Sequence, residues 1–343
     1  MTLLLALTLG TAVGCVSDQQ VIAQAQDVHG QLEPTVVTEP ELANYVQAVG
    51  DRIVDAAEQM YEDGDLEGYN VEPWMFENIQ FHLVASPVTN AFTTGGTHVY
   101  LYSKLFEAAD TEDAFAGVVG HEFGHIVGRH VHESMRNQYY TLGAAAGAGL
   151  IGAALAEDGK RAQTGATVGG LALAGGQVVG LQFGRDNERQ ADELGFEFYI
   201  RAGYDPEKFA NFFAAMLEEQ GDAGGGINGF LSSHPSLAER VKTAQERAAD
   251  VDPSFVQRYE QPPIASPREF ARLQDESQPL TQVAARAAAA QQANAFTEGL
   301  AILSAFPACV GGLSDDIPPS EQSGDNVVPQ ERNERVIPVR RED

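Results

Sequence analysis

Cysteine and basic residues are scarce in this chain. Among its 343 residues there are two cysteines, Cys15 and Cys309, which are too few for a disulfide framework. Lys and Arg number 21 against 49 Asp and Glu, so the formal net charge at pH 7 is −28. Nucleic-acid binding needs a basic surface, and we therefore expect no nucleic-acid partner.

Long hydrophobic runs are also missing. A helix that spans a bilayer needs about 20 consecutive apolar residues. The two segments rich in Gly and Ala, 142–156 and 166–183, are each shorter than this and are separated by the charged stretch "EDGKRAQT". We expect a helical hairpin over 142–183 that packs on the protein, and a hairpin that touches lipid is the alternative.

The N-terminal segment resembles a lipoprotein signal. An apolar stretch at 3–7 runs into "TAVGC", which ends at Cys15. We expect residues 1–15 to be this signal and Cys15 to be lipidated, which would anchor the chain to a membrane. An ordinary cleaved signal or a short apolar tail is the alternative. Val16 and Ser17 stand where an Asp often signals retention in the inner membrane, so the outer membrane is favoured.

Hydrophobic periodicity predicts a mainly helical chain with a few strands. Apolar residues recur at three- and four-residue steps over 39–61. They alternate in "NIQFHLVA" and again near 97–103, after Gly95-Gly96. Further helices are predicted from about Thr111, over 186–201, from Asp205-Pro206 and after "SSHPS".

The regions on either side of these elements differ in composition. Residues 16–38 are polar and rich in Gln, which is typical of a tether. Residues 251–310 predict a C-terminal helical extension with an Ala-rich helix. Residues 311–343 are rich in Pro, Ser and acidic residues, which predicts disorder.

The segment "GVVGHEFGHIVGRH" places His121, Glu122 and His125 in a predicted apolar helix. Burying such polar groups is costly unless something pairs with them. Residues four apart lie on nearly one helix face, so both imidazoles can reach one ion. This spacing is typical of two zinc ligands and a general base, which would be Glu122. Two histidines that hydrogen-bond to neighbours are the alternative.

A third ligand is available in "RDNERQADELG". Glu188 and Asp192 are four apart on a predicted helix, so Glu188 could bind zinc while Asp192 accepts a hydrogen bond from a ligating imidazole. The alternative is a solvated Glu188 that pairs with Arg185 or Arg189. Two His and one Glu leave the fourth position of zinc open, as in catalytic sites. Glu122 could then take a proton from water and pass it to a leaving amine.

These motifs resemble those of a known group. "HEFGHIVGRH" with "RDNERQAD" is similar to the gluzincin zinc metallopeptidases. Within them it resembles the family of the CAAX prenyl protease, the HtpX heat-shock protease and the periplasmic quality-control metallopeptidases of bacterial outer membranes. "NAFTTGG" and "SSHPSLAERV" are similar to further segments of that family. The resemblance covers about residues 39–250.

The resemblance implies a zinc metallopeptidase domain over 39–250 of the α+β class, mostly helical, with a small β-sheet packed on the active-site helix. It implies endopeptidase activity and one Zn(2+) per chain, with His121, His125 and Glu188 as ligands and Glu122 as the base. Relatives that span membranes carry clear transmembrane helices. The lack of a sufficiently long one here indicates the soluble, exported branch.

His234, in "SSHPS", has two candidate roles. As a donor it could stabilise the oxyanion that forms at the attacked carbonyl. As a neutral imidazole it could instead occupy the fourth zinc position and keep the enzyme latent until substrate moves the loop. We favour the latch. His130 and His132, which follow the first motif, are interpreted as structural or surface residues.

The strand within "GGTHVYLYSKL" is a candidate substrate strand. We expect it at a sheet edge beside the zinc, where an extended peptide could pair with it antiparallel through main-chain hydrogen bonds. The residues assigned to this role are Gly96, Thr97, His98 and Val99.

Together these features predict a zinc-dependent endopeptidase that cuts misfolded or misassembled cell-envelope proteins. Its expected place is the periplasmic side of a Gram-negative envelope, held at the outer membrane by the lipid on Cys15. A chaperone-like zinc-binding envelope protein without proteolysis is the alternative. Glu122 favours the enzyme, because a structural zinc site needs no base. An aminopeptidase would need an acidic cluster for the free amine, and the sequence does not place one.

Overall fold

The computed structural model describes residues 16–137, 183–222 and 237–305, together with residues 172–174, residues 177–179 and His234. Its α-helices are α1 (Asp18–Leu32), α2 (Pro40–Glu62), α3 (Ser103–Ala108), α4 (Glu112–Val127), α6 (Arg185–Arg201), α7 (Asn211–Asp222), α9 (Leu237–Ala249), α10 (Pro253–Tyr259) and α11 (Pro267–Ala305). Its strands are β1 (Gln80–Val84), β2 (Ala91–Thr93), β3 (His98–Tyr102), β4 (Ala172–Ala174) and β5 (Gln177–Val179). Short 3-10 helices lie at Glu33–Thr35, Pro73–Met75 and Pro206–Lys208.

Three regions named above lie outside the described residues. They are the predicted lipoprotein signal with Cys15, most of the predicted hairpin at 142–183, and the predicted disordered tail at 311–343.

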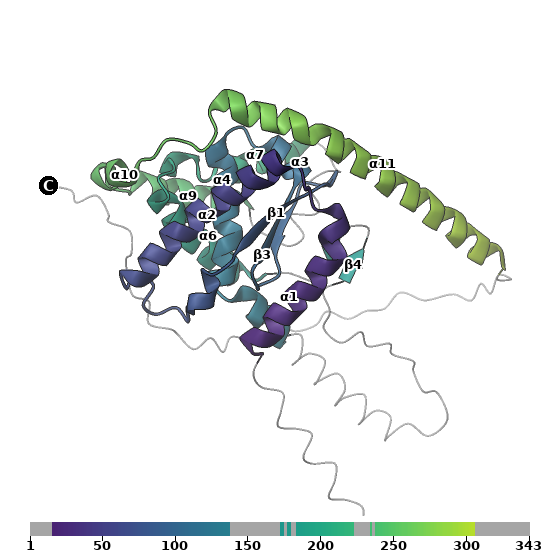
Figure 1. Cartoon of the computed structure of the whole chain (residues 1–343), viewed down its shortest axis with the longest axis horizontal. Coiled ribbons are helices and arrows are strands. Elements are labelled where there is room, and N and C mark those ends of the chain that lie inside the picture. Colours follow the sequence, from purple (N-terminus) through teal and green to yellow (C-terminus); the bar gives the residue numbers. More distant parts are fainter. Residues whose placement is uncertain are drawn as a thin grey trace, which may run out of the picture.

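A three-stranded sheet lies between α1 on one side and the main group of helices on the other (Figure 1). Its order is β1-β3-β2, with β3 parallel to β1 and antiparallel to β2. Successive side chains of a strand point to opposite faces. The face that carries Phe81 packs on α2, where Gly50 leaves room for the Phe81 ring. The predicted α+β class, mostly helical with a small sheet, is confirmed.

The predicted position of the substrate strand is wrong. β3 is the central strand, so its main chain is paired on both sides and all five of its side chains are buried. A peptide cannot add to a strand whose hydrogen-bonding groups are already used. His98 and Val99 therefore lie within the paired strand, and the carbonyl of Thr97 accepts from the Gln80 N–H, so the strand that follows Gly96 offers no free edge. Alternating hydrophobicity predicts a strand but not its neighbours.

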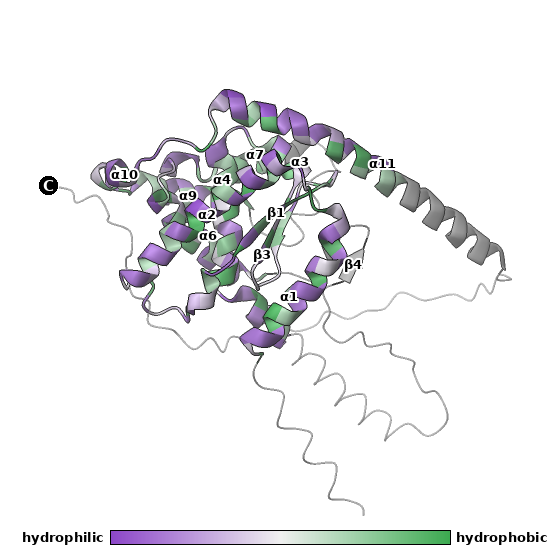
Figure 2. Ribbon diagram, in the orientation of Figure 1, coloured by the Kyte–Doolittle hydropathy of each residue, from purple (hydrophilic) through white to green (hydrophobic). Residues whose placement is uncertain are grey.

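Helices α4 and α6 form the centre of the molecule. Thr111 begins α4 by accepting a hydrogen bond from the Ala114 N–H, as the sequence predicts. At Gly195 the two backbones come close together: a Cβ on Gly195 would lie 2.7 Å from the Gly120 carbonyl oxygen. Close helix contact through glycines brings the motifs on α4 and α6 together. Figure 2 shows hydrophilic and hydrophobic residues interspersed along α2 and along the coloured part of α11.

Two expectations on the flanking segments are corrected. The segment expected to be a tether contains α1, whose Val21, Ala25, Val28 and Leu32 are buried. They recur at four- and three-residue steps, which buries one face of the helix despite its many Gln residues. In the second half of the expected helical hairpin, β4 and β5 pair antiparallel. Gly-Gly separates them in the sequence, a pair that favours two-residue hairpin turns.

The predicted C-terminal extension contains α10 and α11. Helix α11 lies across the domain against α3 (Figure 1). Gln274 donates to the carbonyls of Phe106 and Ala109, near the C-terminal end of α3. Among the described residues, no helix is both long and apolar enough to cross a bilayer.

Candidate metal centre

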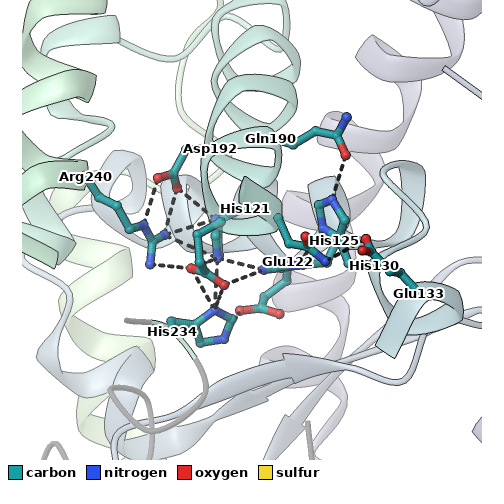
Figure 3. A network of polar contacts seen from close by, with 11 residues as sticks. His121, Glu122, His125, His130, Glu133, Gln190, Asp192, His234 and Arg240 are labelled. Atoms are coloured by element: carbon teal, nitrogen blue, oxygen red, sulfur yellow. Dashed lines mark hydrogen bonds and ion pairs between the residues drawn. The ribbon is translucent and has the colours of Figure 1, made fainter. Parts of the chain in front are cut away.

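Four buried side chains converge at the centre of the molecule (Figure 3). His121 and His125 come from α4, Glu188 comes from the first turn of α6, and His234 precedes α9. Each is at most 1% exposed. One ligand atom from each lies within 4.8 Å of those of the others. The structure therefore brings together the three predicted metal ligands and His234.

The distances within this group fit a tetrahedral ion. His121 Nε2 lies 3.1 Å from His125 Nε2 and 3.6 Å from Glu188 Oε2, and His125 Nε2 lies 3.5 Å from Glu188 Oε1. His234 Nδ1 is 3.2 Å from His121 Nε2 and 3.0 Å from Glu188 Oε1. Ligand atoms at about 2.0–2.1 Å from a tetrahedral zinc would be about 3.4 Å apart. Imidazole nitrogen and carboxylate oxygen are ligands that zinc prefers, so the residues present fit this ion.

Asp192 lies where the sequence predicts it. Its Oδ1 is 2.9 Å from His121 Nδ1, so it can accept the hydrogen bond that leaves His121 Nε2 facing the cluster. Burial opposes the charge of Asp192, but the adjacent Arg240 guanidinium and His121 outweigh this effect and lower the pKa of the carboxyl. Asp192 is thus an anion within hydrogen-bond distance of His121.

Sequence reasoning did not assign a role to Arg240. This buried residue of α9 donates from Nε and Nη2 to the two oxygens of Asp192, each at 2.7 Å, and its Nη1 lies 2.8 Å from Glu188 Oε2. Its guanidinium also lies over the Phe213 ring, 4.5 Å from the centroid. One arginine therefore holds both carboxylates. Its place after the His-Pro segment, in "SSHPSLAERV", was the available signal.

Glu122 is fully buried beside the cluster. Its Oε1 lies 3.4 Å from His234 Nε2, and neither of its carboxylate oxygens has a hydrogen-bond partner among the described residues. Burial raises the pKa of Glu122 to about 7, with His234 acting in the opposite direction. A carboxyl group in this range can both accept and release a proton near neutral pH.

His130 is buried and contacts the back of His125. The Nδ1 atoms of the two rings are 2.8 Å apart, and His130 Nε2 is 2.7 Å from Gln190 Oε1 (Figure 3). His132 instead lies 3.0 Å from Asp18 Oδ1 of α1. Neither belongs to the four-residue group, in agreement with a structural interpretation.

Residues 42–248, more than half of the chain, match the profile of Peptidase family M48. The chain belongs to peptidase family M48. M48 metallopeptidases are in general zinc-dependent, and a buried His and Glu group that can bind a metal is present here. The matched range coincides with the region of resemblance to gluzincin metallopeptidases, and that interpretation is confirmed.

Named relatives agree with M48 membership. The Beta-barrel assembly-enhancing protease of Escherichia coli (strain K12) is 28% identical over 229 residues, which are 66% of this chain and 42% of the relative. Its Yersinia pestis counterpart is 28% identical over 250 residues, 71% of this chain and 47% of the relative. The Mitochondrial metalloendopeptidase OMA1 of Saccharomyces cerevisiae is 28% identical over 198 residues, which are 56% of this chain and 51% of the relative. The matches span only about half of the length of these relatives.

Proposed function

We propose that this chain is a zinc-dependent endopeptidase that hydrolyses peptide bonds in misfolded or misassembled cell-envelope proteins. The observation that carries the proposal is the buried set of His121, His125 and Glu188 with Glu122 beside it. The names of the relatives, which include a beta-barrel assembly-enhancing protease and a metalloendopeptidase, support both the reaction and the substrate class.

In the proposed mechanism His121, His125 and Glu188 hold one zinc ion per chain. When bound there, zinc supplies the Lewis acid that polarises the carbonyl of the scissile peptide bond. Glu122 accepts the proton of the attacking water and returns it to the leaving amine. Asp192 orients His121, and Arg240 holds the carboxylates of Asp192 and Glu188 in position.

β2 takes the place of β3 as the proposed docking strand. Within the described residues β2 pairs with β3 alone, which leaves its other edge unpaired. Helix α4, which carries Glu122, contacts β2. An extended peptide on this edge would lie beside the base. Main-chain pairing tolerates many side chains, as a quality-control protease requires.

His234 is the proposed latch. Its Nδ1 stands 3.0 Å and 3.2 Å from the two oxygens of Glu188 and 3.2 Å from His121 Nε2. These contacts support the fourth ligand position for His234 rather than the oxyanion role, because a ring among the ligands leaves that position closed to substrate. In this resting arrangement cleavage would require His234 to move away.

The deciding experiment incubates zinc-loaded protein with casein or with an unfolded outer-membrane protein. The wild type should cleave, and Glu122→Gln should retain zinc but lose activity by about 100- to 10,000-fold, because Gln cannot accept the proton. Glu188→Ala should lose both metal and activity. Equal cleavage by Glu122→Gln and wild type would overturn the mechanism. A wild type that protects substrates from aggregation without cutting them would establish the chaperone-like alternative.

Lipid attachment at Cys15, and with it a location on the periplasmic side of the outer membrane, completes the proposal. It is supported by the "TAVGC" segment. Cys15→Ser should move the protein from the membrane fraction to the soluble periplasmic fraction. An unmodified Cys15 in the mass spectrum of the mature protein would refute the anchor.

A further inference from the structure

A second group of histidines lies away from the four residues of the candidate metal centre. His29 is in the last turn of α1, His82 is in β1 and His98 is in β3. Gln80 pairs with His98, so His82, two residues along, lies diagonally across from His98 on the same face of the sheet. This is the face that α1 covers (Figure 1).

The three imidazoles are in direct contact. His82 Nε2 and His98 Nδ1 are 2.9 Å apart. The ring centroid of His29 lies 4.7 Å from that of His82 and 4.3 Å from that of His98. One nitrogen from each ring lies within 4.8 Å of those of the others. His98 is buried, and the other two rings are partly buried.

The surroundings leave the rings of His82 and His98 with lone pairs at neutral pH. Burial, with the neighbouring imidazoles, lowers the pKa of His82 to about 3 and that of His98 to about 4, so both are uncharged. The Tyr100 hydroxyl is 3.2 Å from His29 Nδ1. If Nδ1–H of His29 donates to it, Nε2 keeps its lone pair. Three imidazoles form a donor set suited to zinc, copper and nickel rather than to calcium or magnesium.

We propose that His29, His82 and His98 bind a second ion of the zinc, copper and nickel class. The His29 and His98 rings are inclined by only 6°, and a metal lies in the plane of each imidazole that binds it. Binding therefore turns at least one ring about χ2, which is a broad torsion in histidine. Three ligands leave a further coordination position to water.

The ion would fasten α1 to the sheet. The other end of α1 is already held: Asp18 accepts from Trp74 Nε1 at 2.9 Å and contacts His132 and Arg129. His29, at the far end, joins a helix outside the M48 match to two strands inside it. A metal link at this point completes the attachment of the helix at both ends.

The test measures zinc bound per chain after incubation with zinc and removal of the unbound ion. The full-length His82→Phe and His98→Phe variants, which keep an aromatic ring at each position, should each bind about one equivalent less than wild type. His132→Phe is the matched control, because His132 also contacts α1, and it should bind as wild type does. Equal stoichiometry in all four proteins would overturn the proposal.

Two further measurements separate this site from the candidate catalytic centre and from misfolding. A chain with His121→Ala and His125→Ala should still bind an ion, and adding His98→Phe should abolish that binding. In the wild type, zinc should shift the ring ¹⁵N signals of His29, His82 and His98. If those signals stay in place while the signals of His121 and His125 shift, no second site exists.

Discussion

His130 determines which nitrogen of His125 faces the other residues of the candidate metal centre. The amide oxygen of Gln190 can only accept, so His130 Nε2 must donate to it. His130 Nδ1 is then an acceptor, and His125 Nδ1–H donates to it, which leaves the Nε2 lone pair of His125 toward the cluster. Arg129, whose φ of 59° lies in the left-handed region, forms with Gly128 the turn between α4 and His130.

Removing that hydrogen bond should weaken metal binding. His130→Phe keeps the ring volume but leaves His125 free to rotate and to change tautomer. We expect the zinc affinity of the candidate centre to fall about 10- to 100-fold. Competition with a chromophoric chelator measures this change, with His132→Phe as control. An unchanged affinity would mean that packing alone positions His125.

The latch at His234 makes a prediction of the opposite sign from an ordinary catalytic residue. His234→Ala should raise basal cleavage of an unfolded substrate, because the fourth ligand position is no longer occupied. The oxyanion role instead requires about a 100- to 1000-fold loss of turnover. Initial rates at saturating zinc distinguish the two, and a rate equal to that of wild type would remove both roles.

Single residues of the site were predictable where chemistry fixes their spacing. His121 and His125 must be four apart to share an ion, and Asp192 must follow Glu188 by one turn. Arg240 could not be found in this way, because its contacts join α9 to α6. The number of residues between two helices does not show which of their side chains meet in space.

At the scale of elements, the contact between α4 and α6 controls the geometry of the site. Cβ atoms on Gly120 and Gly124 would lie 3.0 Å and 2.5 Å from the carbonyl oxygens of Gly195 and Ala191. These atoms are backbone, which cannot move without shifting a helix. The separation of the two helices, and with it the distance from His121 and His125 to Glu188, therefore depends on glycine.

Gly195→Ala should separate the helices and destabilise the fold. Its added methyl would lie 2.7 Å from the Gly120 carbonyl oxygen, and overpacking of this kind costs about 1–3 kcal/mol in the free energy of unfolding. Zinc affinity should fall as well. Gly30→Ala, on the exposed side of α1 with nothing within 4 Å, is the control and should raise stability by about 0.4–1 kcal/mol. Urea unfolding measures both, and equal shifts would contradict the packing argument.

Sequence periodicity predicted the long amphipathic helix α2, the strands β1 and β3, and helices α4 and α6. It missed α1 because the many polar residues of "DQQVIAQAQDVHGQL" concealed a narrow apolar stripe. It also misplaced β3, since the order of strands depends on tertiary contacts between distant segments. β2 lies between β1 and β3 in the sequence, yet β1 pairs with β3. No local sequence pattern indicates this pairing.

For the whole molecule, the excess of acid extends into the core. Glu197 of α6 is 4% exposed, and burial raises the pKa of its carboxyl to about 8, which Arg201 and Arg247 only partly offset. The native protein therefore holds a proton on Glu197 at pH values where the unfolded chain, with an ordinary pKa of 4.5, has lost it. Folding stability must then depend on pH through this residue.

The sign of this dependence follows from linkage. Below about pH 4.5 both states are protonated and Glu197 has no effect on the pH dependence. Between about pH 4.5 and about pH 8 the native state binds more protons, so the free energy of unfolding falls as pH rises, by about 1.4 kcal/mol per pH unit at most.

Glu197→Gln removes the titration but keeps the shape of the side chain. The stability of this variant relative to wild type should increase steadily across this window and level off above about pH 8. Urea unfolding of both proteins at several pH values gives the difference directly, in which the titration of all other groups cancels. A difference that stays constant with pH would show that Glu197 is ionised in the native protein and is stabilised by Arg201 and Arg247.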